Sequence, residues 1–327
     1  MGNKIRWGIL GPGKIAHHFV KDLQLVEEAE LCAVASRTLE KAEQFKSDYN
    51  VKHAFGSYQE LFACEEVDVI YIATPHTHHA KWAIEAMRNG KHVLCEKPLG
   101  INTAEVHRII QAAKANKVFL MEALWSRFNP TIQKIKERID KGDIGTVGYV
   151  NADFAFYAMD RDVHGRVLNP ELAGGTLLDI GIYPIFLAYL ILGVPSQILA
   201  TSNFHENGAE VQTSMIFSYD NAQAVLYSGF TSKSRMKAEI AGSEGSIYLD
   251  ARWHETQGYT IEKNEVMTEV NSPTSGRGYS YEIEEVHRCL KANVLESELW
   301  SHQNSMDLIG LLDQVRSQAG IRFPFEA

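Results

Sequence analysis

The chain has 327 residues, of which 45% are hydrophobic and 22% are charged, and its formal net charge is −9. This length exceeds the usual size of a single hydrophobic core and predicts two domains. A net negative charge disfavours nucleic-acid binding, which requires a concentrated basic surface. The longest apolar stretch, "IFLAYLILGV", is too short to span a bilayer. We therefore expect a protein that binds neither nucleic acid nor membranes.

The cysteines and the start of the sequence indicate the compartment. The four cysteines are scattered, without a Cys-x-x-Cys pair or a spacing typical of zinc sites. Free, mostly buried thiols in a reducing compartment are expected. The first residues lead directly into the strand-like "IRWGIL", without the apolar segment of a signal peptide. Both observations predict a cytoplasmic protein.

Residues 1–124 alternate short apolar runs with amphipathic stretches. Helices are expected between the runs, at 14–26, 38–49, 78–90 and 104–115. The apolar runs are "IRWGIL", "ELCAVAS", "VDVIYIAT", "KHVLCEK" and "KVFLMEA". Strands that are apolar on both faces and alternate with helices predict a doubly wound parallel sheet.

The pattern changes in residues 125–327. A helix at 130–141 precedes the strand-like "TVGYVNADFAF", and "GGTLLDIGIYPIFLAYLILG" is expected to form a buried helix. Short runs separated by turns then predict a large, mainly antiparallel sheet, covered by helices on one face. The loop "NSPTSGRG" is expected to be mobile. Helices close the chain near 281–293 and 304–319, and the last of them could pack back on the first domain.

A glycine-rich turn follows the first predicted strand. "WGILGPGKIA" contains Gly11 and Gly13 in a Gly-x-Gly-x-x-Ala pattern that ends at Ala16, with Lys14 and Ile15 opening the helix. Gly11 permits the tight turn, Gly13 lets the backbone approach a pyrophosphate, and Ala16 lets helix and strand pack closely. The helix N-terminus supplies free N–H groups. The pattern predicts dinucleotide binding by a Rossmann domain.

The end of the second strand discriminates between NAD and NADP. A chain that prefers NAD usually carries Asp or Glu there, to bind the ribose 2′-hydroxyl. Here Ser36 and Arg37 occupy that place. A guanidinium binds a 2′-phosphate through two hydrogen bonds. We predict NADP, with NAD as the alternative; Arg37 would then be only a solvated loop residue.

Three histidines lie in "IATPHTHHA", after the next predicted strand. Thr74, Pro75, His76 and His79 are expected to contact the cofactor, because ligands bind at the carboxyl edge of such sheets. The side chains of His76, His78 and His79 would diverge, and neither cysteine nor carboxylate joins them at ligand spacing. We therefore expect no metal.

Lys97 ends the next apolar run, between Glu96 and Pro98. It falls on the same edge of the sheet, where desolvation and an oxidised nicotinamide would favour the neutral amine. Such an amine could exchange a proton with a substrate hydroxyl. Glu96 is expected to hold Lys97 in place and to belong to the cofactor site. The alternative is a surface lysine at a strand end.

The chain resembles the Gfo/Idh/MocA oxidoreductase family over essentially its whole length. The resemblance rests on the glycine turn at 11–16, on "EKP" at 96–98 and on "DIGIY" at 179–183. The family usually carries histidine at the end of the last motif. Tyrosine there, with "MEALWSRF" and "NPELAGG", resembles the branch of dimeric dihydrodiol dehydrogenases, NADP-dependent aldose (xylose-type) dehydrogenases and glucose–fructose oxidoreductase. That branch uses NADP(H).

This resemblance implies roles for Asp179 and Tyr183. Four residues apart, they would share one face of a helix, and Pro184 should kink that helix or start it. We expect Tyr183 to be the general acid/base on the reacting oxygen, and a nearby lysine cation would favour its phenolate. Lys97 would polarise the same oxygen, and Asp179 would bind a second hydroxyl.

The substrate is expected to be a cyclic polyol, an aldose or a trans-dihydrodiol. Trp125 and Phe154 match aromatic positions of the substrate wall in that branch, and Arg166 is a further candidate for a substrate hydrogen bond. The resemblance also implies a homodimer formed through the sheet of the second domain. The alternatives are a reductase of another small carbonyl compound and a non-catalytic regulator that senses NADP.

Overall fold

The computed structural model describes residues 4–326 and divides them into two compact units. The first unit contains the residues up to Phe128 together with Thr274–Met306, and the second contains Asn129–Pro273 and the residues from Asp307 on. The expected boundary between residues 124 and 125 follows the sequence alone, whereas this division follows spatial contacts and groups 274–306 with the N-terminal residues.

The first unit is built on a six-stranded parallel sheet of order β3-β2-β1-β4-β5-β6. Almost every residue of β1, β4, β5 and β6 is buried, as the continuous apolar runs predict. The strands are β1 (Ile5–Leu10), β2 (Ala29–Ala35), β3 (His53–Phe55), β4 (Val69–Ile72), β5 (His92–Glu96) and β6 (Leu120–Ala123). The predicted doubly wound sheet is confirmed.

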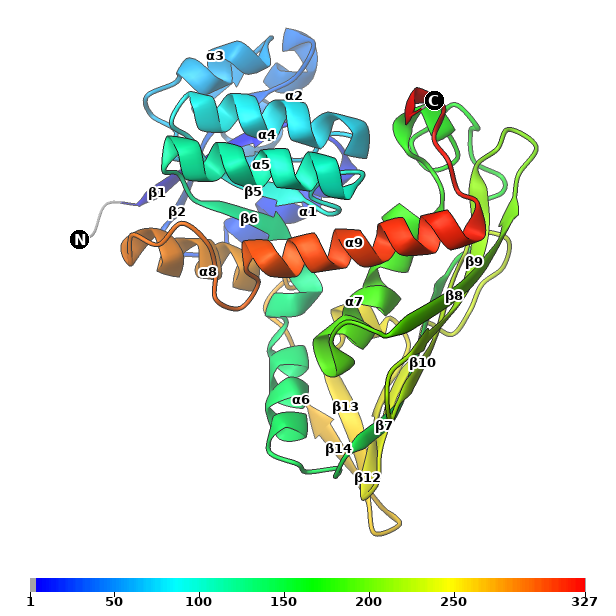
Figure 1. Ribbon diagram of the computed structural model, residues 1–327. Coiled ribbons are helices and arrows are strands. Elements are labelled where there is room, and N and C mark those ends of the chain that lie inside the picture. The colour runs from blue at the N-terminus through cyan, green and yellow to red at the C-terminus, as the bar shows by residue number, and fades with distance from the viewer. Residues whose placement is uncertain (1–3, 327) are drawn as a thin grey trace. The chain divides into compact units, whose positions relative to one another are not determined.

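Helices cover this sheet, and α4 and α5 lie side by side in front of it in Figure 1, whereas α1 packs against α8. Their ends follow local chemistry: Ser57 and Glu60 form a capping box at α3, and the Asn102 side chain caps α5. The helices are α1 (Lys14–Leu23), α2 (Leu39–Tyr49), α3 (Tyr58–Ala63), α4 (His79–Arg88), α5 (Thr103–Asn116) and α8 (Ser280–Lys291).

A buried carboxylate fastens the segment that leads into α8. Asp22, on α1, accepts hydrogen bonds from the backbone N–H groups of Arg277 (2.9 Å), Gly278 (2.9 Å) and Tyr279 (2.8 Å). Gly276 has a φ of +57°, and a Cβ there would lie 2.3 Å from a carboxylate oxygen of Asp22. The end of the loop that we expected to be mobile is therefore anchored to α1.

The second unit contains an eight-stranded sheet of order β14-β13-β12-β11-β7-β10-β9-β8. Its neighbours are antiparallel except for β7 and β10, which run parallel, so the prediction of a mainly antiparallel sheet is confirmed. The strands are β7 (Val147–Ala155), β8 (Gln197–Phe204), β9 (Glu210–Ser218), β10 (Gln223–Gly229), β11 (Ala238–Gly242), β12 (Gly245–Leu249), β13 (Gly258–Lys263) and β14 (Val266–Asn271).

Helix α7 (Ile182–Leu192) is the central helix of this unit and packs on β7 and β10, and α6 (Pro130–Asp140) contacts α7. The first seven residues of α7 are all buried, because the sequence is apolar on every side of the helix. The last helix, α9 (His302–Ala319), begins in the first unit and ends in the second. Within residues 4–326, no helix is both long and apolar enough to cross a bilayer.

Candidate active site

The glycine turn lies between β1 and α1, as the sequence predicts. Gly11 has a φ of +89°, and a Cβ there would lie 3.1 Å from the carbonyl oxygen of Ala73. Gly13 caps α1, and a Cβ at Gly13 would meet nothing within 4 Å among the described residues. Ala16 is fully buried, whereas Lys14 is exposed. The open helix N-terminus fits the pyrophosphate of a dinucleotide.

Arg37 lies at the carboxyl edge of the sheet, near His78 from the loop after β4 and Tyr58 from α3. Ser36 is buried, and its N–H donates to the carbonyl oxygen of Phe55 (3.1 Å), whereas Arg37 is exposed. Burial lowers the pKa of His78, and the positive charge of Arg37 lowers it further. Burial raises the pKa of Tyr58, and Arg37 opposes this shift. Arg37 therefore brings positive charge to this edge of the sheet, and its contact with a 2′-phosphate stays a prediction.

The loop after β4 contains a buried hydroxyl and a buried histidine. The Thr74 hydroxyl has no hydrogen-bond partner among the described residues, which fits a loop that receives a polar ligand. His79 is fully buried, with Nδ1 2.8 Å from the carbonyl oxygen of Pro98 and Nε2 2.9 Å from that of Thr74. Burial lowers its pKa to about 4, against the effect of both carbonyls. His79 thus lies between the loop after β4 and the turn after β5, and its contact with the cofactor stays a prediction.

Lys97 follows β5 and is half-buried, and the peptide bond to Pro98 is cis. Burial raises the pKa of Glu122, and the positive charge of Lys97 opposes this shift. The Lys97 ammonium therefore lies near the Glu122 carboxyl group. The carboxylate of the preceding residue, Glu96, accepts a hydrogen bond from the hydroxyl of Tyr71. The structure thus gives Glu96 a partner on β4 that the sequence did not reveal.

Glu122, at the end of β6, holds the turn after Lys97 and was missed from the sequence. Its Oε1 accepts from the Leu99 N–H (2.8 Å), and its Oε2 accepts from Trp300 Nε1 (3.1 Å) and Ser305 Oγ (2.7 Å). Only 3% of Glu122 is exposed. A carboxylate that interrupts the apolar run "KVFLMEA" is the one sequence signal that could have found it.

Trp125 begins a short 3-10 helix after β6 and stacks on Tyr279, with ring centroids 4.5 Å apart and an angle of 13°. The backbone of Tyr279 is in turn held by Asp22. Trp125, which we predict to contact the substrate, is therefore backed by a second ring within the first unit. The second ring comes from a segment more than 150 residues further along the chain.

In the second unit, Asp179 and Tyr183 lie on either side of a change from π-helix to α-helix. Leu177–Gly181 form a π-helical turn and α7 begins at Ile182, so the two residues do not share one regular α-helix as expected. Pro184 is the third residue of α7, but the backbone is already helical from Leu177, so Pro184 does not start the helix. The change from π-helix to α-helix lies two residues before it. Both candidate side chains are buried, and Arg166 Nη1 donates to Asp179 Oδ1 at 2.8 Å.

The Tyr183 ring belongs to an aromatic cluster. Its centroid lies 5.5 Å from that of Phe154 and 5.4 Å from that of His254, and the last two rings stack at 4.2 Å. Phe154 was expected here from the resemblance. His254 was missed, because it lies in "ARWHETQG", which carries no recognisable motif.

Glu210 positions the π-helical turn and was also missed. It is fully buried and accepts hydrogen bonds from the Leu177 N–H (2.9 Å) and from the hydroxyls of Thr176 and Thr213. Burial raises its pKa, whereas these hydrogen bonds oppose the shift. Gly181 completes the fit, since a Cβ there would lie 2.9 Å from Ser228 Oγ. The glycine of the "DIGIY" motif is needed for this close approach.

Family models match both parts of the chain. Residues 5–124 match an oxidoreductase family with an NAD-binding Rossmann fold, and residues 132–248 match the GFO/IDH/MocA C-terminal domain. The chain belongs to the Gfo/Idh/MocA oxidoreductase family. The resemblance stated from the motifs is confirmed, and the chain is an enzyme of the oxidoreductase class with a nicotinamide-dinucleotide domain.

Relatives match this Gfo/Idh/MocA protein over nearly its whole length. A scyllo-inositol 2-dehydrogenase (NADP(+)) of Bacillus subtilis is 36% identical over 326 residues, covering 98% of each chain. A trans-1,2-dihydrobenzene-1,2-diol dehydrogenase of Xenopus tropicalis is 34% identical over 332 residues, covering 98% of this chain and 99% of the relative. The crystal structure of a 3-ketoreductase of Actinomadura kijaniata with NADP and TDP-benzene has a TM-score of 0.87 and 26% identity, covering 97% of this chain and 98% of that one.

The dinucleotide unit of this Gfo/Idh/MocA protein also buries a carboxyl group for which the motifs give no reason. Glu282, on α8, is fully buried, and neither of its oxygens has a hydrogen-bond partner among residues 4–326. Burial raises its pKa well above the ordinary value, and the negative charges of Glu96 and Asp22 raise it further. Burial and the neighbouring negative charges therefore both favour the neutral form of Glu282, which lies near Glu96 at the end of β5.

This protonation predicts a pH-dependent difference between the wild type and Glu282→Gln. A group whose pKa is raised by folding stabilises the folded state fully below its unfolded pKa, and this stabilisation is lost as pH rises through the folded pKa. The unfolding free energy of the wild type minus that of the variant should therefore fall as pH rises above the ordinary pKa of a glutamate side chain. Urea unfolding at several pH values measures it. The exposed Glu284→Gln on the same helix should give a constant difference, and a constant difference for Glu282→Gln would contradict a raised pKa.

Proposed function

We propose that this enzyme is an NADP-dependent dehydrogenase of a cyclic polyol, an aldose or a trans-dihydrodiol. The observation that carries the proposal is the position of Lys97, at the carboxyl end of β5 on the sheet edge that also carries the glycine turn. Relatives named as an inositol dehydrogenase and a dihydrodiol dehydrogenase support this substrate class. NADP, when bound, supplies the nicotinamide carbon that accepts or donates the hydride.

The chain's own residues manage the proton and the substrate. In the oxidising direction, Tyr183 accepts the proton of the substrate hydroxyl while the neighbouring C–H bond gives up its hydride, and a carbonyl group forms. The Lys97 ammonium holds the same oxygen and stabilises negative charge on it. Asp179, oriented by Arg166, binds a second hydroxyl. Trp125 and Phe154 contact the apolar face of the ring.

The choice of NADP rests on Arg37. Its guanidinium is exposed after β2, and its positive charge acts to lower the pKa of both His78 and Tyr58. The acidic residue with which NAD-preferring chains bind the 2′-hydroxyl is replaced by Ser36 and Arg37. The inositol relative named above is itself named for NADP(+).

A homodimer is proposed through the open face of the eight-stranded sheet. Leu199, Ile216 and Val225 lie in one row across β8, β9 and β10, because Leu199 pairs with Ile216 and Ile216 pairs with Val225. They are 50%, 40% and 38% exposed, respectively. A row of exposed apolar side chains across the last three strands of the sheet favours association with a second copy. We place the dimer in the cytoplasm, where the free thiols of the described residues would stay reduced.

Replacing Tyr183 by Phe should lower turnover by roughly 10²- to 10⁴-fold, because it removes the general acid/base. The affinity for NADPH should change little, since the phenol acts on the substrate. Steady-state absorbance at the nicotinamide band, with a panel of inositols, aldoses and diols, measures turnover, and fluorescence titration measures NADPH binding. Tyr189→Phe on the same helix is the matched control. An equal loss of turnover and NADPH affinity in Tyr183→Phe would reject the assignment.

Replacing Arg37 by Asp should reverse the preference between the two cofactors. The ratio of kcat/KM for NADP to that for NAD should fall by more than about tenfold, because a carboxylate repels the 2′-phosphate and can bind a 2′-hydroxyl. Arg88→Asp makes the same change of charge at the exposed end of α4 and should leave the ratio unaltered. An unchanged ratio in Arg37→Asp would mean that Arg37 does not contact the phosphate.

Replacing Ile216 by Glu should convert the dimer into a monomer, because a charge in the middle of the apolar row would be buried without a partner. Light scattering after size-exclusion chromatography measures the mass of wild type and variant. The control is Leu25→Glu, which changes another exposed apolar side chain, in the first unit. A monomeric wild type, or a dimeric Ile216→Glu variant, would contradict the proposed interface.

A further inference from the structure

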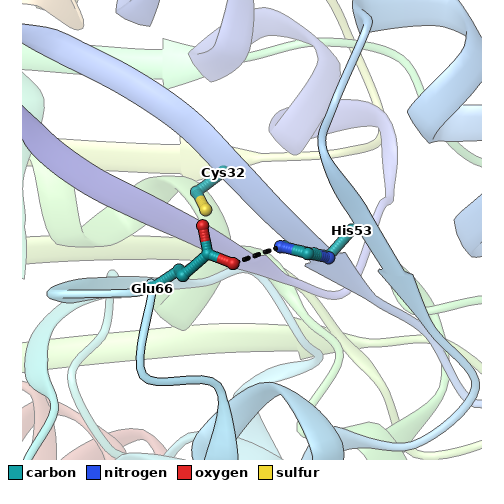
Figure 2. Close-up of side chains that lie close together, drawn as sticks. All are labelled: Cys32, His53 and Glu66. Atoms are coloured by element: carbon teal, nitrogen blue, oxygen red, sulfur yellow. Dashed lines mark hydrogen bonds and ion pairs between the residues drawn. The ribbon is translucent and has the colours of Figure 1, made fainter.

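Three side chains of different chemistry converge in the first unit, apart from the residues discussed above. Cys32 lies on β2, His53 opens β3, and Glu66 lies between α3 and β4. The Cys32 sulfur, a ring nitrogen of His53 and a carboxylate oxygen of Glu66 all lie within 4.8 Å of one another. Figure 2 shows the three groups turned toward one another. His53 Nε2 lies 3.0 Å from Glu66 Oε1.

This Cys32–His53–Glu66 cluster lies away from the carboxyl edge that would bind the dinucleotide. Cys32 comes three residues before the end of β2, and the parallel pairing of β2 with β3 places His53 opposite Ala33. The residues expected to bind the 2′-phosphate, Ser36 and Arg37, follow only after β2 has ended. The cluster is therefore a separate feature of the unit, outside the proposed chemistry of Lys97 and Tyr183.

Thiolate, imidazole and carboxylate are the three side-chain ligands of protein-bound zinc. Zinc bonds of about 2.0–2.3 Å in tetrahedral geometry place neighbouring ligand atoms roughly 3–4 Å apart. His53 Nε2 and Glu66 Oε1 are 3.0 Å apart, and the three ligand atoms all lie within 4.8 Å of one another. These distances bracket the range for zinc, so small side-chain rotations would bring all three atoms to bonding distance of one ion. Cys32 is buried, whereas the side chains of His53 and Glu66 are 32% and 44% exposed, which leaves a route for the cation.

The surroundings of Glu66 suit a ligand role. Its two oxygens are divided: Oε1 faces His53, and Oε2 pairs with the Lys52 ammonium. The carboxylate can therefore bind a cation through Oε1 while Lys52 continues to orient it through Oε2, as outer hydrogen bonds orient metal ligands generally. A thiolate and a carboxylate together balance the charge of one divalent cation.

We propose that Cys32, His53 and Glu66 form a binding site for one Zn²⁺ ion, with water as the fourth ligand. Binding releases the thiol proton of Cys32 to solvent and uses the neutral imidazole of His53. No metal was expected from the sequence, where only the histidines at 76–79 suggested one.

The site would fasten the edge of the six-stranded sheet. Strand β3 has only three residues and lies at the end of the strand order. A cation held by β2, β3 and the segment before β4 would join three elements that are separate in the sequence. Because it binds the folded chain only, Zn²⁺ should raise the melting temperature.

The test begins with metal-free wild-type protein titrated with Co²⁺. A sulfur-to-cobalt charge-transfer band with a stoichiometry of one per chain, displaced by Zn²⁺, is the expected result. Cys32→Ser should abolish the band, and His53→Gln should weaken Zn²⁺ binding by at least roughly tenfold, since loss of even an outer-shell partner weakens binding 10–100-fold. Cys64→Ser, two residues from Glu66, is the matched control and should keep the band and the affinity.

The second readout is the melting temperature with and without Zn²⁺. It should rise in the wild type and in Cys64→Ser, and by less in His53→Gln at the same Zn²⁺ concentration; the His53 side chain is 32% exposed and can be replaced without disturbing the core. Absence of the cobalt band and of a Zn²⁺-dependent rise in the wild type would overturn the proposal. Equal Zn²⁺ affinity in His53→Gln and the wild type, or loss of the band in Cys64→Ser, would overturn it as well. None of these measurements depends on turnover.

Discussion

The candidate chemistry depends on the turn that carries Lys97, and two buried side chains hold that turn. His79 reaches the carbonyl of Pro98 from α4, and Glu122 accepts the N–H of Leu99 from β6. Glu122 is itself held by Trp300 and Ser305. A flexible lysine side chain can act on one substrate atom only if the backbone beneath it is immobile. The contacts of the buried His79 and Glu122 side chains with the turn supply that rigidity.

Buried carboxylates act as fasteners in both units. Asp22 binds three consecutive backbone N–H groups, and Glu210 binds the N–H and the hydroxyls around the π-helical turn that carries Asp179. Each carboxylate loses its hydrogen bonds to water when it is buried, and protein donors held in fixed positions replace them. Glu282 is different, because it has no donor among the described residues, and its burial raises its pKa well above the ordinary value.

Local patterns predicted the secondary structure and the edge of the cofactor sheet. The continuous apolar runs, the glycine turn and the charged end of "KHVLCEK" placed Gly11, Arg37 and Lys97 correctly, because each follows a strand whose direction is set by its neighbours. The π-helical turn before α7 was not predicted. Gly181, in this turn, packs closely against Ser228, a contact between distant residues that no local pattern records.

The sequence by itself determined the family, the doubly wound sheet and the residues that follow its strands, because these depend on periodicity and on motifs of a few neighbouring residues. Only the tertiary structure identified the partners Asp22, Glu122 and His254, and only it brought Cys32, His53 and Glu66 together. The physical reason is that these contacts join residues that are far apart in the sequence. A hydrogen bond or a ligand cluster joins whichever side chains the packed sheet places within a few ångströms, and no short-range pattern records that distance.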